Sequence, residues 1–364
     1  MPAATLRLRR LWLQVHKWIG LGLALLIVPI SLTGSALVWH DWLDERLNPE
    51  RAVATTPGLP PSAYAAAARR FARPDERLSS LAYPRESGPV VATLARTGRP
   101  AGGRPVRTLL YLDPASGKLL DRAASDQGAV RILHVLHGSL MVPGVGRQIV
   151  GWVGVAMLLS SMTGLWLWWP LSGGFVRGLR WRRRAMTSAN LHHQGGFWIV
   201  LPLAVLSFTG AWISFPAFFA ALSGDPVGPS MAERMRRMAA LPAAETRLDP
   251  DSALAAARPM ASGDLIGLSW PSGPEARWKI SFARPGGAAE VTVDDRSSQA
   301  APPRPPQPET TARLMRRIHD GTGMGALWQA IIFIGGLIPA LLAATGILMW
   351  LHGRRGRSRA RADP

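Results

Sequence analysis

The sequence predicts a membrane α-helical protein with four transmembrane helices in two tandem repeats, each repeat carrying an extracytoplasmic α+β module. Three observations predict this fold class. Apolar residues gather in four stretches, each close to the roughly 20 residues that a helix needs to cross about 30 Å of hydrocarbon. Basic residues concentrate beside these stretches. Four of the eight histidines recur at matching distances from glycines in the apolar stretches.

The elements follow in chain order. We expect a basic N-terminus (1–17), transmembrane helix 1 (18–40), a first outer module (41–136), a lead-in with helix 2 (137–170), a basic loop (171–194), helix 3 (195–222), a second outer module with a proline-rich linker (223–318), a lead-in with helix 4 (319–352) and a basic tail (353–364). The basic start and first apolar run resemble a signal peptide. The run is too long and lacks a clear cleavage site, so we expect the first helix to be retained.

Charge predicts the side of the membrane on which each segment lies. The net charge is +19, and the segments 1–17, 171–194 and 353–364 together hold 14 Lys or Arg and one acid, Asp363. Short basic segments at helix ends stay in the cytoplasm. We therefore expect both termini in the cytoplasm and both long loops outside. This location accounts for the positive charge without nucleic acid as a partner, and the lipid bilayer is the partner instead.

Missing residues and motifs exclude several classes of chemistry. The chain has no cysteine, which excludes disulfides, thiolate metal ligands and cysteine nucleophiles. It also lacks the Gly-x-Ser-x-Gly elbow, a phosphate-binding glycine loop and the His-Glu-x-x-His motif. A transporter is a weaker possibility, because the apolar stretches lack the charged or broken midplane segments that substrate coupling usually requires.

Matching offsets indicate an internal duplication. His16 precedes Gly34 by 18 residues, as His192 precedes Gly210. Likewise, the second and fourth apolar stretches each contain a glycine 27 residues after a histidine, namely Gly164 after His137 and Gly346 after His319. Each of the four glycines follows a threonine. Small residues allow helices or a flat macrocycle to approach closely, and ordinary helix packing is the favoured interpretation of these Thr-Gly pairs.

The outer loops have the pattern of small α+β modules. In the first loop we expect a helix at 62–71, strands at 90–94 and 108–112, and a turn at 113–118. In the second loop we expect a helix at 251–257 and strands at 277–282 and 290–295. Each helix could cover one face of a short antiparallel sheet. The segment 301–308 is too rich in proline for either element and is expected to be an extended linker.

The repeated histidines predict two metal centres. Two imidazoles that face each other across helices are a ready axial ligand set for haem iron. The duplication would bring His16 to His192 at one face of the membrane and His137 to His319 at the other. Interfacial or surface histidines are the plainer alternative. His193 points about 100° away from its neighbour on a helix, so it is a less favoured ligand.

Three further histidines are weaker candidates. His134 lies one turn before His137, and such a pair can also hold zinc, although the repeat partner of His134 is an arginine. His40 and His352 have proline at the equivalent positions of the other half. Both fit an interfacial residue at a helix end better than an axial ligand.

Several motifs together resemble a known family. They are Val15-His16-Lys17-Trp18-Ile19-Gly20, Leu136-His137-Gly138, Met162-Thr163-Gly164-Leu165-Trp166-Leu167-Trp168-Trp169, Asn190-Leu191-His192, Ile318-His319-Asp320-Gly321 and the Asp-Pro-x-x-Gly-Lys turn at 113–118. The chain resembles the PepSY-associated transmembrane family, which includes bacterial ferric-siderophore reductases, and the outer loops resemble PepSY modules. The second loop departs from the PepSY hairpin at 294–298.

The resemblance also implies a function. It implies a location in the bacterial inner membrane, two b-type haems, electrons supplied by a cytoplasmic reductant or quinol, and reduction of a ferric siderophore or similar ferric chelate outside the membrane. Such a protein sets the potentials of two redox centres through imidazole ligation and burial. The alternative is a PepSY membrane anchor without enzymatic activity, whose outer modules bind a protease or another envelope partner.

Overall fold

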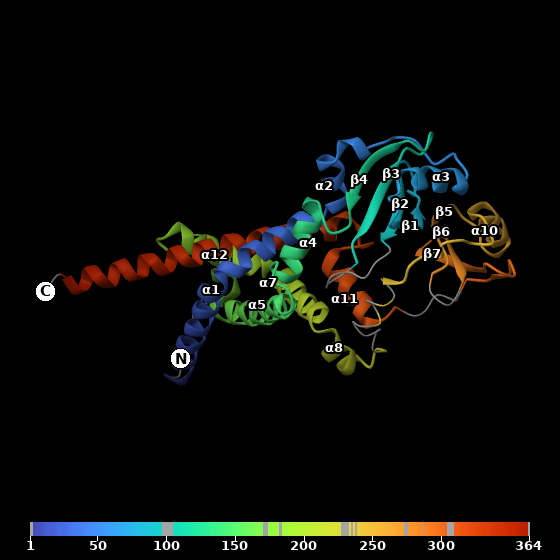
Figure 1. Cartoon of the computed structure of the whole chain (residues 1–364). Coiled ribbons are helices and arrows are strands. Elements are labelled where there is room, and N and C mark those ends of the chain that lie inside the picture. The colour runs from blue at the N-terminus through green and yellow to red at the C-terminus, as the bar shows by residue number, and fades with distance from the viewer. Residues whose placement is uncertain are drawn as a thin grey trace. The chain divides into compact units, whose positions relative to one another are not determined.

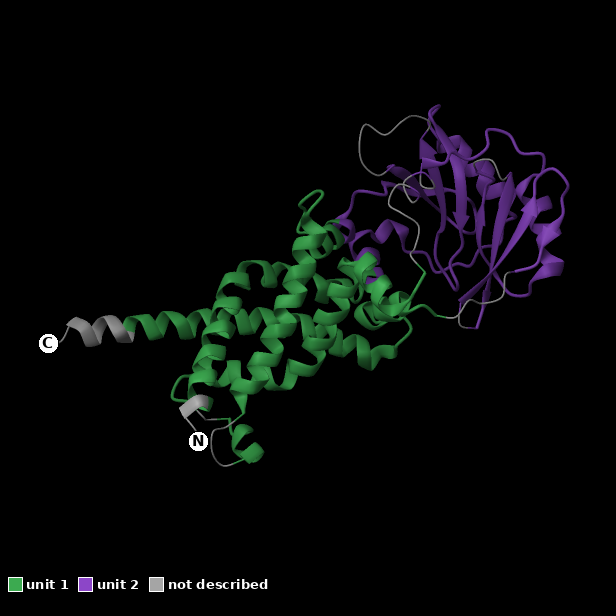
Figure 2. Cartoon of the chain, turned by 90° about the horizontal axis from the view of Figure 1, so that it is seen from below, with its two compact units in different colours: residues 1–40, 132–227, 309–364 green, residues 41–131, 228–308 purple. Residues whose placement is uncertain are grey.

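A computed structural model describes residues 3–96, 105–169, 174–181, 184–226, 233, 236, 239–272, 276–285, 287–303 and 309–362. The chain divides into two compact units (Figure 2). One unit contains residues 1–40, 132–227 and 309–364 and is helical, whereas the other contains residues 41–131 and 228–308 and holds the sheet. Most of the predicted proline-rich linker, residues 304–308, lies outside the described residues.

The helical unit contains the predicted membrane spans. Within the described residues, four helices are long and apolar enough to cross a bilayer (Figure 1). They are α1 (Ala3–Leu37), α5 (Gly146–Trp168), α7 (Thr187–Ser214) and α12 (Gly325–Ala362). Large apolar side chains such as Leu25, Trp198 and Leu327 remain exposed on these helices, as expected where lipid replaces water. The predicted four candidate spans are therefore confirmed.

The four long helices pack in a closed order. Both α5 and α12 pack against α1, and both also pack against α7. This arrangement places α1 and α7 at opposite corners of the bundle. Side chains on α1 and α7 that point inward can therefore meet along its centre.

Shorter helices flank the long ones. They are α2 (His40–Leu47), η1 (Pro49–Arg51), α4 (Ala129–Ser139), α6 (Gly174–Gly178), α8 (Pro216–Ser223) and α11 (Thr311–Asp320). The predicted lead-in segments, which start at 137 and 319, overlap only the ends of α4 and α11, so most of each helix lies in a segment that we assigned to an outer module. Gly321, with φ of +77°, ends α11 in the left-handed conformation that glycine adopts without strain.

Several helix boundaries differ from the predicted ones, among them the end of α12, which continues through the predicted basic tail to Ala362. Helix α1 begins at Ala3, so the basic segment that we assigned to a separate N-terminus forms its first turns. The predicted span 195–222 starts earlier, at Thr187, and is interrupted at Phe215 before α8. Pro216 explains the interruption, because it lacks a backbone N–H and disfavours helical geometry in the residue before it.

The second unit is built on one antiparallel sheet. Its strands are β1 (Glu76–Ala82), β2 (Val90–Arg96), β3 (Arg107–Leu112), β4 (Leu119–Ala124), β5 (Leu265–Ser269), β6 (Arg277–Arg284), β7 (Gly287–Asp294) and β8 (Ala300–Ala301). The order across the sheet is β4-β3-β2-β1-β5-β6-β7-β8. Each loop supplies four neighbouring strands, and the halves join where Leu81 of β1 lies opposite Leu268 of β5. The separate small sheets that we expected are therefore one continuous sheet.

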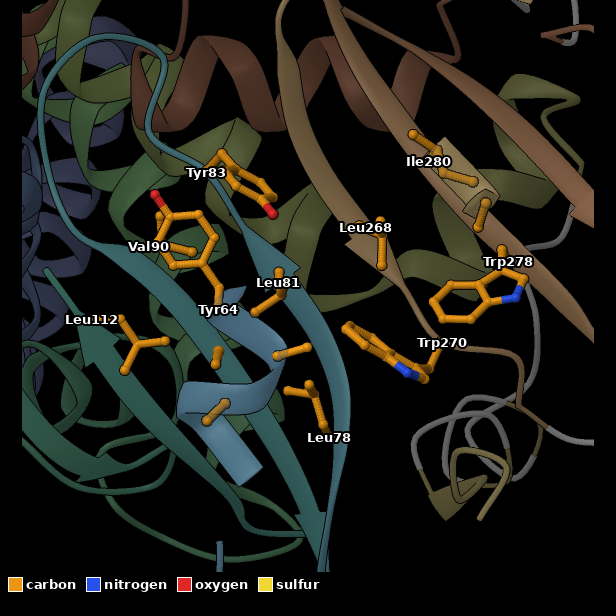
Figure 3. Close-up of a cluster of buried hydrophobic side chains, with 14 of the residues drawn as sticks. Tyr64, Leu78, Leu81, Tyr83, Val90, Leu112, Leu268, Trp270, Trp278 and Ile280 are labelled. Atoms are coloured by element: carbon orange, nitrogen blue, oxygen red, sulfur yellow. The ribbon is translucent and has the colours of Figure 1, made fainter. Parts of the chain in front are cut away.

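A single apolar core covers one face of this sheet. Helix α3 (Pro61–Phe71) from the first loop and helix α10 (Pro250–Ala257) from the second pack against each other and against the strands. Figure 3 shows the buried side chains from both halves, including Tyr64, Leu81 and Trp278. The core is continuous across the β1–β5 junction, since Leu81 and Leu268 are both buried. Neither half alone would keep this face away from water.

The turns before β4 and β8 have the same geometry. Asp113 accepts hydrogen bonds from the backbone N–H and the hydroxyl of Ser116, and Asp294 accepts the equivalent bonds from Ser297. The left-handed position is glycine in the first turn, Gly117, and Ser298 in the second. The second loop thus departs from the hairpin pattern in sequence but not in backbone conformation.

Candidate functional site

Two predicted histidines meet within the four-helix bundle. His16 lies on α1 and His192 on α7, the two helices at opposite corners. Their ring centroids are 6.2 Å apart and their ring planes meet at 85°. We call these residues the first pair.

The other two predicted histidines also face each other. His137 lies on α4 and His319 on α11, and their ring centroids are 6.0 Å apart with an angle of 41° between the planes. We call these residues the second pair. The structure therefore brings together both pairs that the repeat spacing predicts.

The two pairs lie at different levels of the bundle. Helix α1 carries His16 of the first pair, and the carbonyl of Ile30 on the same helix is 2.8 Å from Nδ1 of His137. These 14 positions correspond to about 20 Å along a helix that rises 1.5 Å per residue. Each pair can therefore hold its own group.

Threonine fixes the ring of His16. Nδ1 of His16 lies 3.1 Å from Oγ1 of Thr163 on α5. The Thr163 hydroxyl donates its proton to the carbonyl of Leu159 one turn earlier, at 3.0 Å. Its oxygen is thus an acceptor for the imidazole, which places the proton on Nδ1 and leaves the lone pair on Nε2.

The same arrangement recurs at two other histidines. Nδ1 of His192 lies 3.0 Å from Oγ1 of Thr345, and Nδ1 of His319 lies 3.0 Å from Oγ1 of Thr209. Both threonine hydroxyls donate to carbonyls on their own helices. The fourth histidine, His137, donates from Nδ1 to the Ile30 carbonyl, which can only accept. All four imidazoles therefore present an unprotonated Nε2.

Glycines allow the rings to approach the neighbouring helices. A Cβ atom placed on Gly34 would lie 2.7 Å from Cε1 of His137, and one on Gly164 would lie 3.2 Å from Cε1 of His16. The equivalent distances are 3.1 Å from Gly210 to His319 and 3.5 Å from Gly346 to His192. The Thr-Gly pairs do more than pack helices, because they receive the histidine rings. Sequence reasoning missed this role, although the shared spacing of the pairs and the histidines was its signal.

Other glycines leave space beside the first pair. Gly20 and Gly196 each follow a histidine of that pair by four residues, on the same face of the helix. A Cβ atom on either glycine would meet nothing within 4 Å. The paired imidazoles fit the donor set that a bis-histidine haem requires, and the two glycines place no side chain beside them.

Burial keeps the second pair neutral. Together with a smaller contribution from the nearby His137, it lowers the pKa of His319 to about 4. Burial also lowers the pKa of His137, with a smaller contribution from His134. Both rings are therefore uncharged at neutral pH, which is the form that binds metal.

A protein-family model matches most of the chain. The model of the PepSY-associated TM region matches residues 13–352, a range that contains both histidine pairs and the whole sheet. The chain belongs to the PepSY-associated TM family. The match confirms the resemblance that the helix-end motifs indicated. No curated protein matches the chain significantly.

The remaining histidines of this PepSY-associated TM protein occupy different settings. His193 follows His192 on α7 and does not join the ring contact of the first pair. His352, on α12, is exposed, and its Nδ1 lies 2.7 Å from the carbonyl of Leu348 on its own helix. His134 faces His40, with ring centroids 5.9 Å apart. Among the described residues, no group of three or more His, Cys, Asp or Glu is placed to hold a metal ion.

Proposed function

We propose that the two histidine pairs bind two b-type haems and that the protein carries electrons across the membrane to a ferric chelate such as a ferric siderophore. The observation that carries this proposal is the matched pair of facing imidazoles, each with Nδ1 engaged and Nε2 free. Unrelated surface histidines are not expected to share the same tautomer and nearly the same distance between ring centroids.

The distances within the pairs suit one iron between two rings. Two metal–nitrogen bonds of about 2 Å, extended by the radius of each imidazole, separate the ring centroids by roughly 6 Å. The observed separations are 6.2 Å and 6.0 Å. Haem, when bound at these residues, supplies a one-electron centre whose potential depends on ligation and burial.

The chain's own residues prepare both sites. Thr163, Thr345 and Thr209 hold three of the rings by accepting a hydrogen bond from Nδ1, and the Ile30 carbonyl holds the fourth. Such partners fix the orientation of a ligating histidine and raise its basicity. Because the rings are held before any ligand arrives, less conformational entropy is lost on binding.

We infer the orientation and the repeats from the same features. The basic segments 1–17, 171–194 and 353–364 favour the cytoplasm, which puts the first pair near the inner face and the sheet outside as a PepSY module. Equivalent Thr-Gly contacts and equivalent aspartate turns in the two halves support a tandem duplication. The location is then a bacterial inner membrane.

Reduction of the chelate would release its iron. Chelators with hard oxygen donors hold iron(III) more tightly than the softer iron(II). One electron per iron is required, supplied by a cytoplasmic reductant or a quinol; the iron(III) becomes iron(II), and the chelator is released chemically unchanged. The protein needs no acid, base or nucleophile for this reaction.

An electron-counting experiment tests the proposal. The purified protein is reduced with dithionite, excess reductant is removed, and a ferric siderophore is added while the visible bands and trapped iron(II) are followed. We expect the reduced bands to disappear and iron(II) to form in equal electron equivalents. The gallium(III) chelate is a matched control, since gallium(III) has a similar size and charge but is not reduced. Bands that persist equally with both chelates would contradict ferric-chelate reduction.

A further inference from the structure

Helix α11 carries three arginines on its exposed side. They are Arg313, Arg316 and Arg317, and their spacing of three and four residues places them on one face of the helix. Apolar side chains between them, such as Leu314 and Ile318, are half-buried on the opposite side, and α11 packs against α7 and α8. We call the three exposed residues the arginine face.

Two of these arginines have no carboxylate partner. Arg317 lies 3.3 Å from Glu309, whereas neither Arg313 nor Arg316 forms an ion pair within the part of the chain that the structure describes. The face ends at Asp320, whose carboxylate accepts a hydrogen bond from a backbone N–H of the following turn. Like charges three or four residues apart on a helix repel and destabilise it. A bound anion would therefore relieve the repulsion within the arginine face.

The arginine face adjoins the second pair. Arg316 precedes His319 by three residues, a spacing that places the Cβ atoms of two helical residues about 5–6 Å apart. Burial is the main cause that lowers the pKa of His319, and the positive charge of Arg316 makes a smaller contribution in the same direction. A molecule held by Arg316 would thus lie close to one of the two proposed redox centres.

We propose that the arginine face is the docking surface for the ferric chelate, and that the preferred chelate carries a net negative charge on carboxylate or similar groups. The inference rests on the proposed function, whose substrate class it narrows. The planar guanidinium group pairs with the two oxygens of a carboxylate through parallel hydrogen bonds. Clustered charge also raises the local concentration of an oppositely charged ligand. Anionic lipid is the competing occupant, and the position beside a redox ligand favours the chelate.

Three ferric trihydroxamate chelates with identical iron-binding groups test the selection by charge. One is cationic through a free amine, its N-acetyl derivative is neutral, and its N-succinyl derivative is anionic. The reduced, haem-loaded, full-length protein in phosphatidylcholine nanodiscs is mixed with each chelate, and the rate of haem reoxidation is measured. We expect the anionic chelate to react about 10-fold faster than the neutral chelate, and the advantage to shrink as salt rises.

Substitutions on the arginine face should change this preference. Arg313→Gln combined with Arg316→Gln should slow the reaction of the anionic chelate and leave that of the neutral chelate unchanged. Arg69→Gln combined with Arg70→Gln is the matched control, because it removes the same charge from two exposed arginines of α3. Arg313→Glu combined with Arg316→Glu should reverse the order and favour the cationic chelate, a result that misfolding would not produce.

Binding of the gallium(III) chelates separates docking from electron transfer. The anionic gallium(III) chelate should bind more tightly to the wild type than to the double glutamine variant of the arginine face, as measured by calorimetry. Such binding in a protein that reduces no iron would support the arginine face and contradict the proposed function. Equal reduction rates for all three ferric chelates would retain the proposed function and overturn the arginine face. Glutamine variants that lose only copurified anionic lipid would overturn it as well.

Discussion

Oγ1 of Thr163 lies 3.1 Å from Nδ1 of His16 while the same hydroxyl donates to the carbonyl of Leu159. The helix thereby uses the hydroxyl proton, and the oxygen can only accept from the imidazole. This contact joins α1 to α5 and decides which nitrogen of His16 is available for a ligand.

Replacing Thr163 by valine should weaken ligand binding at the first pair. Valine keeps the shape but removes the nearer of two hydroxyls beside Nδ1 of His16, since Oγ of Ser160 lies 3.3 Å from the same nitrogen, so the ring is held less firmly. Loss of such a partner typically lowers metal affinity about 10–100-fold. The rate of haem transfer from the purified protein to apomyoglobin measures the effect.

Thr33→Val is the matched control for Thr163→Val. The Thr33 hydroxyl bonds to Pro29 and Ile30 of its own helix, while His137 uses the Ile30 carbonyl directly. We expect haem transfer from Thr33→Val to match the wild type. Equal acceleration in the two variants would mean that the hydroxyls act only in helix packing.

Glycine-to-alanine substitutions should have graded effects. A Cβ atom on Gly34 would lie 2.7 Å from Cε1 of His137, whereas one on Gly346 would lie 3.5 Å from Cε1 of His192. Gly34→Ala should therefore displace its ring and lose one haem, and Gly346→Ala should keep both. Alanine favours a helix over glycine by about 1 kcal/mol, so its effect on the backbone alone would stabilise the helix in both variants and would not cause loss of haem. Haem content after purification distinguishes the two variants.

The paired turns of the sheet offer a test of backbone strain. Ser298 has φ of +59° and Gly117 has φ of +69°. A residue with a Cβ atom in this conformation costs roughly 1–2 kcal/mol, so Gly117→Ala should lower the free energy of unfolding of the sheet. Ser298→Gly should raise it or leave it unchanged. Urea midpoints of the two variants provide the comparison, and a stabilising Gly117→Ala would contradict the shared turn geometry.

Glu76 should make the sheet sensitive to acid. Burial alone would raise its pKa, but hydrogen bonds from Thr108 and the Arg73 backbone, together with Arg122, lower the pKa overall. A lowered carboxyl pKa stabilises the fold fully above the unfolded value of about 4.3, and this contribution is lost as pH falls through the lowered folded value.

Glu76→Gln should therefore lower the melting temperature of the sheet at pH 7 and have a shrinking effect toward pH 3. Hydrogen bonds to a charged group contribute about 1.5–3 kcal/mol, which sets the expected size at neutral pH. Thermal unfolding of both proteins across this pH range measures the difference. A difference that does not change with pH would exclude the carboxylate charge as its source.

Local patterns in the sequence were enough to predict the four long helices and the partners within each histidine pair. Long apolar runs leave few alternatives to a membrane span. The shared offsets of His16 and His192 implied equivalent places in two similar halves, and the structure brings these residues together. Haem ligation by them remains a prediction.

Contacts between distant segments could not be predicted in this way. Pairing of β1 with β5 joins strands from two loops, and nothing in either strand specifies its neighbour. The bond from His16 to Thr163 depends on how α1 and α5 rotate against each other. The contact between His40 and His134 likewise requires the tertiary structure, because neither residue has a histidine at the equivalent position of the other half.

The haem content of purified wild-type protein tests the central claim most directly. The protein is expressed with sufficient haem, and the pyridine haemochromogen absorbance is compared with the protein concentration. We predict two b-type haems per chain, falling to one in His16→Ala and to one in His137→Ala. A correctly folded wild-type protein without haem, or two haems retained in both variants, would contradict the assignment of these four histidines.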